Sequence, residues 1–364
     1  MYLDNRKKSY APALVFITLA FFSCAIFLSV PAGAQKIKQL PPPPPAPRYK
    51  PKPTPTPEYE VVRVSSNLVM APVSVTNTQG QPVLGLKTSD FRIEEDGHPQ
   101  EIAQLGDPEQ VPLDIALLID VSGSVVARFA FEQQAAASFL QQVLKPEDRA
   151  TIFAIDESPR MIQPLTTAQL AARKLLTVTP SNGYTAFFDS VLAAANYLDK
   201  SSSSGRRRIV VVISDGDDTA RILGVSAAQN RSDSMKLIGV DAQLQLIRKA
   251  QLDTQREVQR AEITFYSINP SGRTMHLNVR TARSEEGMER IAAATGGAAF
   301  VPRNESELSG IFQQIASEIR SQYLLQYYSN NKAGGTTFRR INVSTPAQPQ
   351  LHVRSREGYF PKGK

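Results

Sequence analysis

The feature that most constrains the fold is a set of apolar runs that alternate with helical patterns along the middle of the chain. The runs are IALLI (115–119), ATIFAI (150–155), IVVVI (209–213) and ITFYSI (263–268), with AAFV (298–301) as a fifth candidate. Such near-continuous hydrophobicity is typical of strands that are buried on both faces. Helical patterns separate the runs, at about 125–144, 168–178, 186–199, 241–261, 286–295 and 305–322. This alternation predicts an α/β fold, a doubly wound and mostly parallel sheet flanked by helices.

The segments on either side of this α/β region, which spans 112–322, have the pattern of short strands. Residues 59–111 and 323–364 alternate apolar with polar side chains, and turn residues such as Asp96-Gly97 interrupt them. Neither segment is large enough to bury an independent core. Because the two ends of a domain commonly lie close together, we expect both segments to pair into one small β subdomain.

Residues 1–34 have the pattern of an export signal. A positively charged start precedes an uncharged stretch from Ala11 to Val30, and Ala32 and Ala34 form an A-x-A cleavage pattern. The apolar stretch is also long enough to span a bilayer, so a retained membrane anchor is the alternative to a cleaved signal peptide. In both cases the positive end stays in the cytoplasm. We therefore expect the folded part to be exported, whether periplasmic, secreted or anchored facing outwards.

A proline-rich linker, residues 35–58, follows this signal. Ten of the seventeen residues from Pro41 to Pro57 are proline. A segment of this composition prefers the extended polyproline II conformation and does not pack into a core. We interpret it as a spacer between the folded part and a membrane or envelope layer.

Charge and cysteine content exclude several functional classes. The net charge of +7 is spread along the chain, and no basic stripe with interleaved aromatic residues accompanies it. Nucleic acid is therefore not an expected partner. The single cysteine, Cys24, lies in the N-terminal apolar stretch, so the remainder has no disulfide, zinc–thiolate site or thiol nucleophile.

Oxygen-bearing side chains follow the predicted strands where candidate ligand sites of a parallel sheet lie. The first strand ends in Asp120, and Ser122 and Ser124 follow it in the pattern D-x-S-x-S. Asp215 comes directly after the run 209–213, and Thr185 precedes a predicted helix. Ligands of open α/β sheets bind beyond the carboxyl ends of the strands, so we expect these five residues to converge.

Two carboxylates and three hydroxyls form an all-oxygen set that suits a hard cation and does not suit zinc. Mg²⁺ is the expected ion, with Mn²⁺ or Ca²⁺ as alternatives. Two carboxylates only neutralise a divalent ion, and hydroxyls donate weakly. The ion would therefore keep one coordination position open for an acidic group of a partner.

The three loops together resemble the metal-ion-dependent adhesion site (MIDAS) of von Willebrand factor type A (VWFA) domains. The resemblance covers about Pro112 to Arg320, and the flanking segments resemble those of bacterial exported VWFA-related proteins. It implies a Rossmann-like fold with Asp120, Ser122, Ser124, Thr185 and Asp215 as the metal site. It further implies that the two aspartates act partly through water and that the two serines coordinate directly, while Thr185 engages according to conformational state.

The leading functional hypothesis is a non-enzymatic binding or adhesion module that holds a divalent cation and recruits an Asp or Glu of a protein partner. The alternative is a structural envelope scaffold in which the metal only stabilises the fold. A serine hydrolase is disfavoured, because no G-x-S-x-G elbow is present and no histidine follows a predicted strand beside the Asp120 loop. Ser122 or Ser124 as a simple helix N-cap remains an alternative reading of the motif. Asp217 and Asp218 are expected to brace their loop rather than to bind metal.

Overall fold

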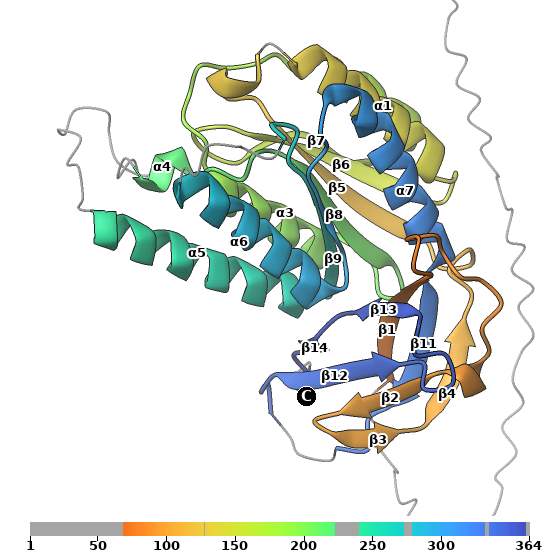
Figure 1. Cartoon of the computed structure of the whole chain (residues 1–364). Helices are drawn as coiled ribbons and strands as arrows, with labels where there is room; N and C mark the ends of the chain where they lie inside the picture. Colours follow the sequence, from red (N-terminus) through yellow and green to blue (C-terminus); the bar gives the residue numbers. More distant parts are fainter. Residues whose placement is uncertain (1–67, 127, 223–239, 273–278, 332–334, 362–364) are drawn as a thin grey trace, which may run out of the picture. The chain divides into compact units, whose positions relative to one another are not determined.

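The computed structural model describes residues 68–126, 128–222, 240–272, 279–331 and 335–361 (Figure 1). These residues belong to one compact unit, Arg63–Lys364. The predicted signal or anchor, the linker and the first predicted strand, which begins at Tyr59, lie outside the described residues. Within the described part, no helix is both long and apolar enough to cross a membrane.

A six-stranded sheet forms the centre of the α/β region, in the order β10-β9-β8-β5-β6-β7. Its strands are β5 (Leu113–Asp120), β6 (Arg149–Ile155), β7 (Arg160–Thr166), β8 (Arg207–Ile213), β9 (Ile263–Ile268) and β10 (Ala299–Phe300). All neighbours are parallel except β7, which runs antiparallel to β6. The predicted doubly wound, mostly parallel sheet is confirmed.

Helices cover both faces of this sheet (Figure 1). One face carries α1 (Phe129–Val143), α2 (Ala168–Leu175) and α7 (Leu308–Ser321), and the other carries α3 (Phe187–Ser201), α5 (Val240–Arg260) and α6 (Val279–Thr295). The short α4 (Thr219–Ile222) follows β8 and contacts α5. The helices enclose the sheet, which is why its strands lack polar alternation.

Strand β5 lies at the centre of the domain, and all eight of its residues are buried. Ile115, Leu117 and Ile119 pack against α1 and α7, whereas Ala116 and Leu118 pack against α3 and α6. Burying each large apolar side chain stabilises the fold by about 1.5–3 kcal/mol. Packing on both faces fixes the position at which β5 ends, and therefore the position of Asp120.

The two flanking segments pair with each other, as predicted, and they form two sheets. One sheet has the order β13-β1-β11-β4 and the other β14-β12-β2-β3. The strands are β1 (Leu68–Thr76), β2 (Arg92–Glu95), β3 (His98–Gln100), β4 (Ile102–Gly106), β11 (Tyr323–Tyr328), β12 (Arg339–Ser344), β13 (His352–Ser355) and β14 (Gly358–Tyr359). Apolar side chains from both sheets share one core, so we call this unit the β-sandwich.

A buried polar cluster joins the α/β region to the β-sandwich. Glu318 on α7 accepts hydrogen bonds from the Ser74 hydroxyl on β1 (2.9 Å) and the Tyr266 hydroxyl on β9 (2.8 Å). It also pairs with Arg354 on β13. Burial, together with the neighbouring Glu318 charge, raises the pKa of the Tyr266 hydroxyl well above its ordinary value. The cluster holds the end of α7, which leads directly into β11, against the β-sandwich.

Candidate functional site

The candidate site begins at Asp120, the last residue of β5. Asp120 pairs in register with Ile155 of β6, and Ile119 pairs with Ile213 of β8. Three parallel strands therefore end side by side, and the segments that follow them start from one edge of the sheet. The Asp120 side chain is fully buried at this edge.

Two donors from different loops hold the Asp120 carboxylate. The backbone N–H of Ser122 donates to Oδ1 (2.9 Å), and the Ser214 hydroxyl donates to Oδ2 (2.7 Å). Burial raises the pKa of Asp120, and the nearby Asp215 charge adds to this, while the Ser122 and Ser214 hydrogen bonds oppose it. The carboxylate is thus fixed in orientation and lies close to a second negative charge.

Ser122 and Ser124 lie in the turn after β5, where the 3₁₀ helix η2 (Gly123–Val125) begins. Ser122 is at the N-cap position of η2 and is buried, but its side chain makes no capping hydrogen bond. Its hydroxyl instead hydrogen-bonds Asp120. For Ser122 the N-cap alternative is therefore wrong. The Ser124 side chain lies outside the described part of the chain.

Asp215 opens the loop after β8 and is partly exposed. Its Oδ1 accepts a hydrogen bond from the Asp217 N–H (3.0 Å), and the Ser214 hydroxyl accepts one from the Gly216 N–H (3.0 Å). Gly216 has a φ of 75°, a left-handed conformation that glycine adopts readily, and a Cβ there would lie 2.8 Å from Met288. Glycine at position 216 is therefore favoured by the backbone of this turn.

Thr185 lies in the segment before α3 and is buried. Its N–H donates to the Thr219 hydroxyl (2.7 Å), and its carbonyl accepts from the Ala220 N–H (3.1 Å). The Thr185 loop is thus tied to the segment four residues beyond Asp215. The next residue, Ala186, donates its N–H to the Asp156 carbonyl (2.9 Å), which ties the same loop to the end of β6.

Asp218 braces these loops, as its sequence position predicted. Its carboxylate accepts hydrogen bonds from the N–H of Phe188 (3.0 Å), at the start of α3, and from the N–H of Arg221 (3.1 Å). The Asp218 side chain is buried, and both contacts are with backbone. Asp218 therefore connects the loop after β8 to α3.

Sequence reasoning missed two residues near the site, Ser214 and Glu132. Glu132 on α1 is buried, its Oε1 accepts from Arg128 Nε (2.9 Å), and its Oε2 has no hydrogen-bond partner. Burial raises the pKa of Glu132 to about 7, against the effect of Arg128 and with contributions from the charges of Asp120 and Glu305. The spacing of Arg128 and Glu132, four residues apart in a helix, was the available signal.

The donor set at this edge consists of carboxylates and hydroxyls. Among the described residues, no group of three or more His, Cys, Asp or Glu is arranged to hold a metal ion. A site with two carboxylates, Asp120 and Asp215, has to complete its ligand set with hydroxyls or water. An ionised carboxylate has about four acceptor positions, and the Ser122 N–H, the Ser122 hydroxyl and the Ser214 hydroxyl take three of them at Asp120, so one remains for a hard cation.

Comparison with known protein families matches one segment of the chain. A model of the von Willebrand factor type A domain matches residues 115–217, the segment that contains all five predicted site residues. No curated protein sequence matches the chain.

Several solved structures are similar at low identity. The vWF domain of the type V pili tip protein Mfa5 from Porphyromonas gingivalis is 13% identical, with 57% of this chain and 95% of that chain covered and a TM-score of 0.42. The PilB minor pilin from Streptococcus sanguinis is 14% identical, with 58% and 62% covered and a TM-score of 0.43. A von Willebrand factor type A protein from Catenulispora acidiphila is 12% identical, with 82% and 64% covered and a TM-score of 0.43.

The match runs from β5 to the loop after β8. The chain therefore contains a von Willebrand factor type A domain, inserted between the two segments that build the β-sandwich.

Proposed function

We propose that this protein is an exported, non-enzymatic binding module that uses a divalent cation to capture an acidic group of a protein partner. The observation that carries the proposal is the Asp120 carboxylate, buried at the end of the central strand and held by donors from two loops beside Asp215. A buried carboxylate next to a second one is unfavourable without a compensating positive charge. Mg²⁺ is the proposed ion, with Mn²⁺ or Ca²⁺ as substitutes.

Asp120, Ser122, Ser124, Thr185 and Asp215 would hold the ion, and the ion would supply a positively charged acceptor for an anion. The two aspartates balance its charge without an excess of negative ligands, so an Asp or Glu of a partner remains attractive to it. The protein's part is to keep these oxygens in fixed positions. The hydrogen bonds of Ser214 and Thr219, from the segment after β8, perform this task.

Two of the three histidines lie in the described part of the chain. His98 begins β3 and His352 begins β13, so both belong to the β-sandwich. Neither of these two lies beside Ser122 at the carboxyl edge of the central sheet, which favours binding over hydrolysis, and His276 lies outside the described residues. A serine nucleophile there would need a base within hydrogen-bond reach.

Calorimetric titration of the purified protein with MgCl₂ tests the cation site. We expect a single site in the wild type, and loss of the binding heat in Ser122→Ala and Asp215→Ala. Glu101→Gln is the matched control, because Glu101 is an exposed carboxylate of the β-sandwich. Binding of equal affinity in the wild type and both site variants would contradict the proposal.

A capture experiment separates the binding module from the structural scaffold. The protein is immobilised and exposed to envelope extract with Mg²⁺ or with chelator, beside Ser122→Ala and Glu101→Gln. We expect a partner that is retained only with Mg²⁺ and lost when its contacting Asp or Glu is changed to Asn or Gln. For a scaffold, chelation would lower the melting temperature and leave the captured proteins unchanged.

A further inference from the structure

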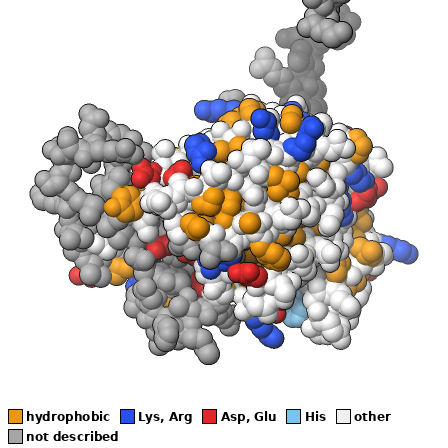
Figure 2. All heavy atoms as spheres, turned by 90° about the horizontal axis from the view of Figure 1, so that it is seen from above, with side chains coloured by type: hydrophobic (Ala, Val, Ile, Leu, Met, Phe, Trp, Pro, Cys, Tyr) orange, Lys and Arg blue, Asp and Glu red, His pale blue; other side chains and the backbone are white. Residues whose placement is uncertain are grey.

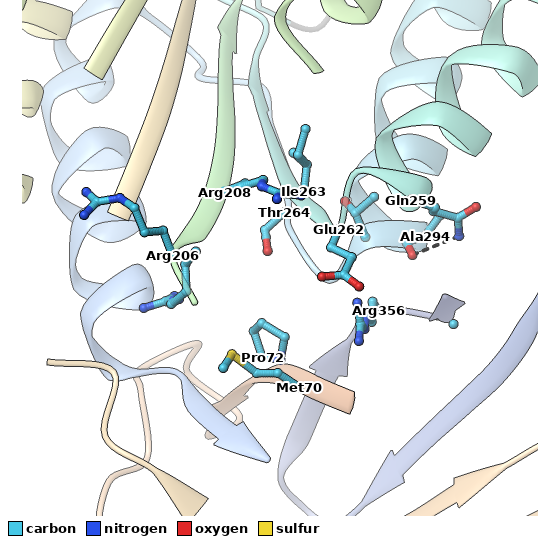
Figure 3. A pocket seen from close by; sticks show the side chains of 13 residues that line it. Met70, Pro72, Arg206, Arg208, Gln259, Glu262, Ile263, Thr264, Ala294 and Arg356 are labelled. Carbon is cyan, nitrogen blue, oxygen red and sulfur yellow. Dashed lines mark hydrogen bonds between the residues drawn. The ribbon is translucent and has the colours of Figure 1, made fainter. Parts of the chain in front are cut away.

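A cavity of about 60 Å³ lies between the α/β region and the β-sandwich (Figure 3). Arg208 and Thr264, near the starts of β8 and β9, line it from above, and Met70 and Pro72 of β1 line it from below. Because parallel strands start at the edge opposite to the one where they end, the cavity is remote from the candidate cation site. By a similar measure one water needs roughly 10–15 Å³, so a few waters or one small ion fit.

Arg356, which also lines the cavity, is a largely buried cation. Only 8% of its surface is exposed. Its Nε is fully buried and has no hydrogen-bond partner, and no ion pair of Arg356 is found among the described residues. The guanidinium carbon of Arg356 lies 5.4 Å from the centroid of the Tyr359 ring, which is a cation–π contact.

This arrangement is unfavourable unless an anion or water is present. Arginine stays protonated at any physiological pH, so it cannot reduce the cost of burial by losing its proton. A cation over an aromatic ring offsets only part of the cost of removing the charge from water. Five N–H donors of a planar guanidinium match the oxygens of phosphate or carboxylate.

The backbone around Arg356 is held firmly in place. The N–H of Glu357 donates to the Ala294 carbonyl at the end of α6 (3.1 Å), and Arg354 Nε donates to the Gly296 carbonyl (3.3 Å). A Cβ at Gly296 would lie 2.8 Å from the backbone nitrogen of Arg356, so the two backbone segments are in close contact. Arg356 is therefore positioned by the fold and is not a mobile surface side chain.

Other donors face the same space. Arg208 keeps its Nε buried without a partner, while its Nη1 donates to Asp199 and to the Ala261 carbonyl. The Thr264 hydroxyl points down into the cavity in Figure 3. The guanidinium of Arg206 points away, towards its partner Asp114, and contributes no free donor.

One carboxylate, that of Glu262, lies beside Arg356 in Figure 3. Glu262 takes part in a polar interaction of its own, so it is not a free carboxylate. Its negative charge would oppose an incoming anion, and this provides a variant that should strengthen binding.

We propose that this cavity is a binding site for a small oxyanion, with Arg356 as the main ligand and with Arg208 and Thr264 as additional donors. The bound anion would neutralise Arg356 and stabilise the junction between the α/β region and the β-sandwich. The site is independent of the cation site and does not rest on the proposed function. Inorganic phosphate fits the volume and the donors, and a small carboxylate such as acetate shares the same chemistry.

Calorimetry and thermal unfolding of the purified full-length protein, without Mg²⁺, test this site. Sodium phosphate, sodium sulfate and sodium acetate are compared with sodium chloride at equal ionic strength. We expect phosphate to bind at one site and to raise the melting temperature above that in chloride. Acetate binding equal to phosphate binding would identify a carboxylate ligand of the same site.

Variants decide whether Arg356 holds the anion. We expect Arg356→Gln to weaken phosphate binding at least tenfold, Thr264→Val to weaken it severalfold, and Glu262→Gln to strengthen it. Arg290→Gln is the control, because Arg290 on α6 is exposed and pairs with Glu286.

If Arg356→Gln does not fold, the Thr264→Val and Glu262→Gln variants still test the site, because they should change phosphate affinity in opposite directions. No binding of any oxyanion to the wild type, or unchanged affinity in the folded Arg356, Thr264 and Glu262 variants, would overturn the proposal.

Discussion

The hydroxyl of Ser214 donates a 2.7 Å hydrogen bond to Oδ2 of Asp120, and so joins the ends of β8 and β5. The two residues are 94 positions apart in the sequence. Figure 2 views the molecule from above relative to Figure 1, and hydrophobic side chains there form small groups among polar ones. The Ser214–Asp120 contact lies at the carboxyl edge of the central sheet, and both side chains are buried.

Removal of the Ser214 hydroxyl should weaken cation binding while leaving the fold intact. In Ser214→Ala the Asp120 carboxylate loses one of its three donors, at a cost of about 1–3 kcal/mol in unfolding free energy. We expect the Mg²⁺ affinity, measured by calorimetry, to fall severalfold. Ser190→Ala is the control, because the buried Ser190 hydroxyl bonds only the Ala186 carbonyl within α3. A similar Mg²⁺ affinity in both variants would show that Ser214 does not position the site.

Glu132 should make stability depend on pH. Its pKa is about 7 in the folded protein, against 4.5 for the ordinary side chain, so the folded state holds the proton more tightly than the unfolded state does. The resulting stabilisation is present below pH 4.5 and is lost as the pH rises through about 7. We expect the wild type to lose about 2–3 kcal/mol more than Glu132→Gln between pH 5 and pH 8.

Urea unfolding of both proteins at several pH values measures this difference. The charged groups that act on Glu132 are Arg128, Asp120 and Glu305, and all of them are retained in the variant. Parallel pH profiles for the two proteins would disprove the assignment to Glu132.

The cluster around Glu318 should stabilise the junction between the α/β region and the β-sandwich. Glu318→Ala would leave the buried Ser74 and Tyr266 hydroxyls, and the partly exposed Arg354, without their shared acceptor. Leaving a buried hydroxyl without its acceptor costs about 1–3 kcal/mol. Glu289→Ala, at an exposed position of α6, should change the unfolding free energy by less than about 0.5 kcal/mol. Urea denaturation compares the two, and equal stability would contradict a role for the cluster.

Two glycine substitutions should have effects of opposite sign. A Cβ at Gly297 would lie 1.9 Å from the Phe265 carbonyl oxygen of β9, so Gly297→Ala should prevent normal packing of β10 against β9. A Cβ at Gly310 on α7 meets nothing within 4 Å, and alanine there should stabilise the helix by about 0.5–1 kcal/mol. Thermal unfolding of both variants checks this, and a stabilised Gly297→Ala would show that β9 and β10 do not approach as described.

The sequence predicted the main strands because their apolar runs are long and uninterrupted. The run 115–119 became β5 and the run 209–213 became β8, each extended by charged residues at its start. Strand β7 was missed because it is an edge strand. Its sequence RMIQPLT is largely exposed and contains Pro164, so it has neither the apolar run nor the alternation of a strand.

The start of the last helix was predicted less accurately than the strands were. Residues 305–322 were predicted as one helix, but Glu305–Glu307 form the 3₁₀ helix η3 and α7 begins at Leu308. The Asn304 side chain caps η3 by accepting a hydrogen bond from the Ser306 N–H (3.0 Å). The start of the helical segment was thus predicted, and only the type of its first turn was wrong.

The position of the candidate site could be predicted from the sequence because the ends of the apolar runs mark the ends of the strands. Asp120 and Asp215 follow apolar runs, so their placement at one sheet edge follows from parallel pairing. Ser214 and Glu132 were not predictable in this way, since their contacts depend on which strands and helices are neighbours in space. The buried Glu95 of the β-sandwich, which accepts hydrogen bonds from Tyr327 (2.8 Å) and Ser329 (2.7 Å), was missed for the same reason.

Paramagnetic broadening by Mn²⁺ in amide NMR spectra tests the central claim most directly, because it reports where the cation binds. We expect substoichiometric Mn²⁺ to broaden the amide signals of 120–124, 185 and 214–216 first, and excess Mg²⁺ to restore them. In Asp120→Asn this selective broadening should be absent. Uniform broadening across the protein, or selective broadening at other residues only, would contradict a cation site at the carboxyl edge of the sheet.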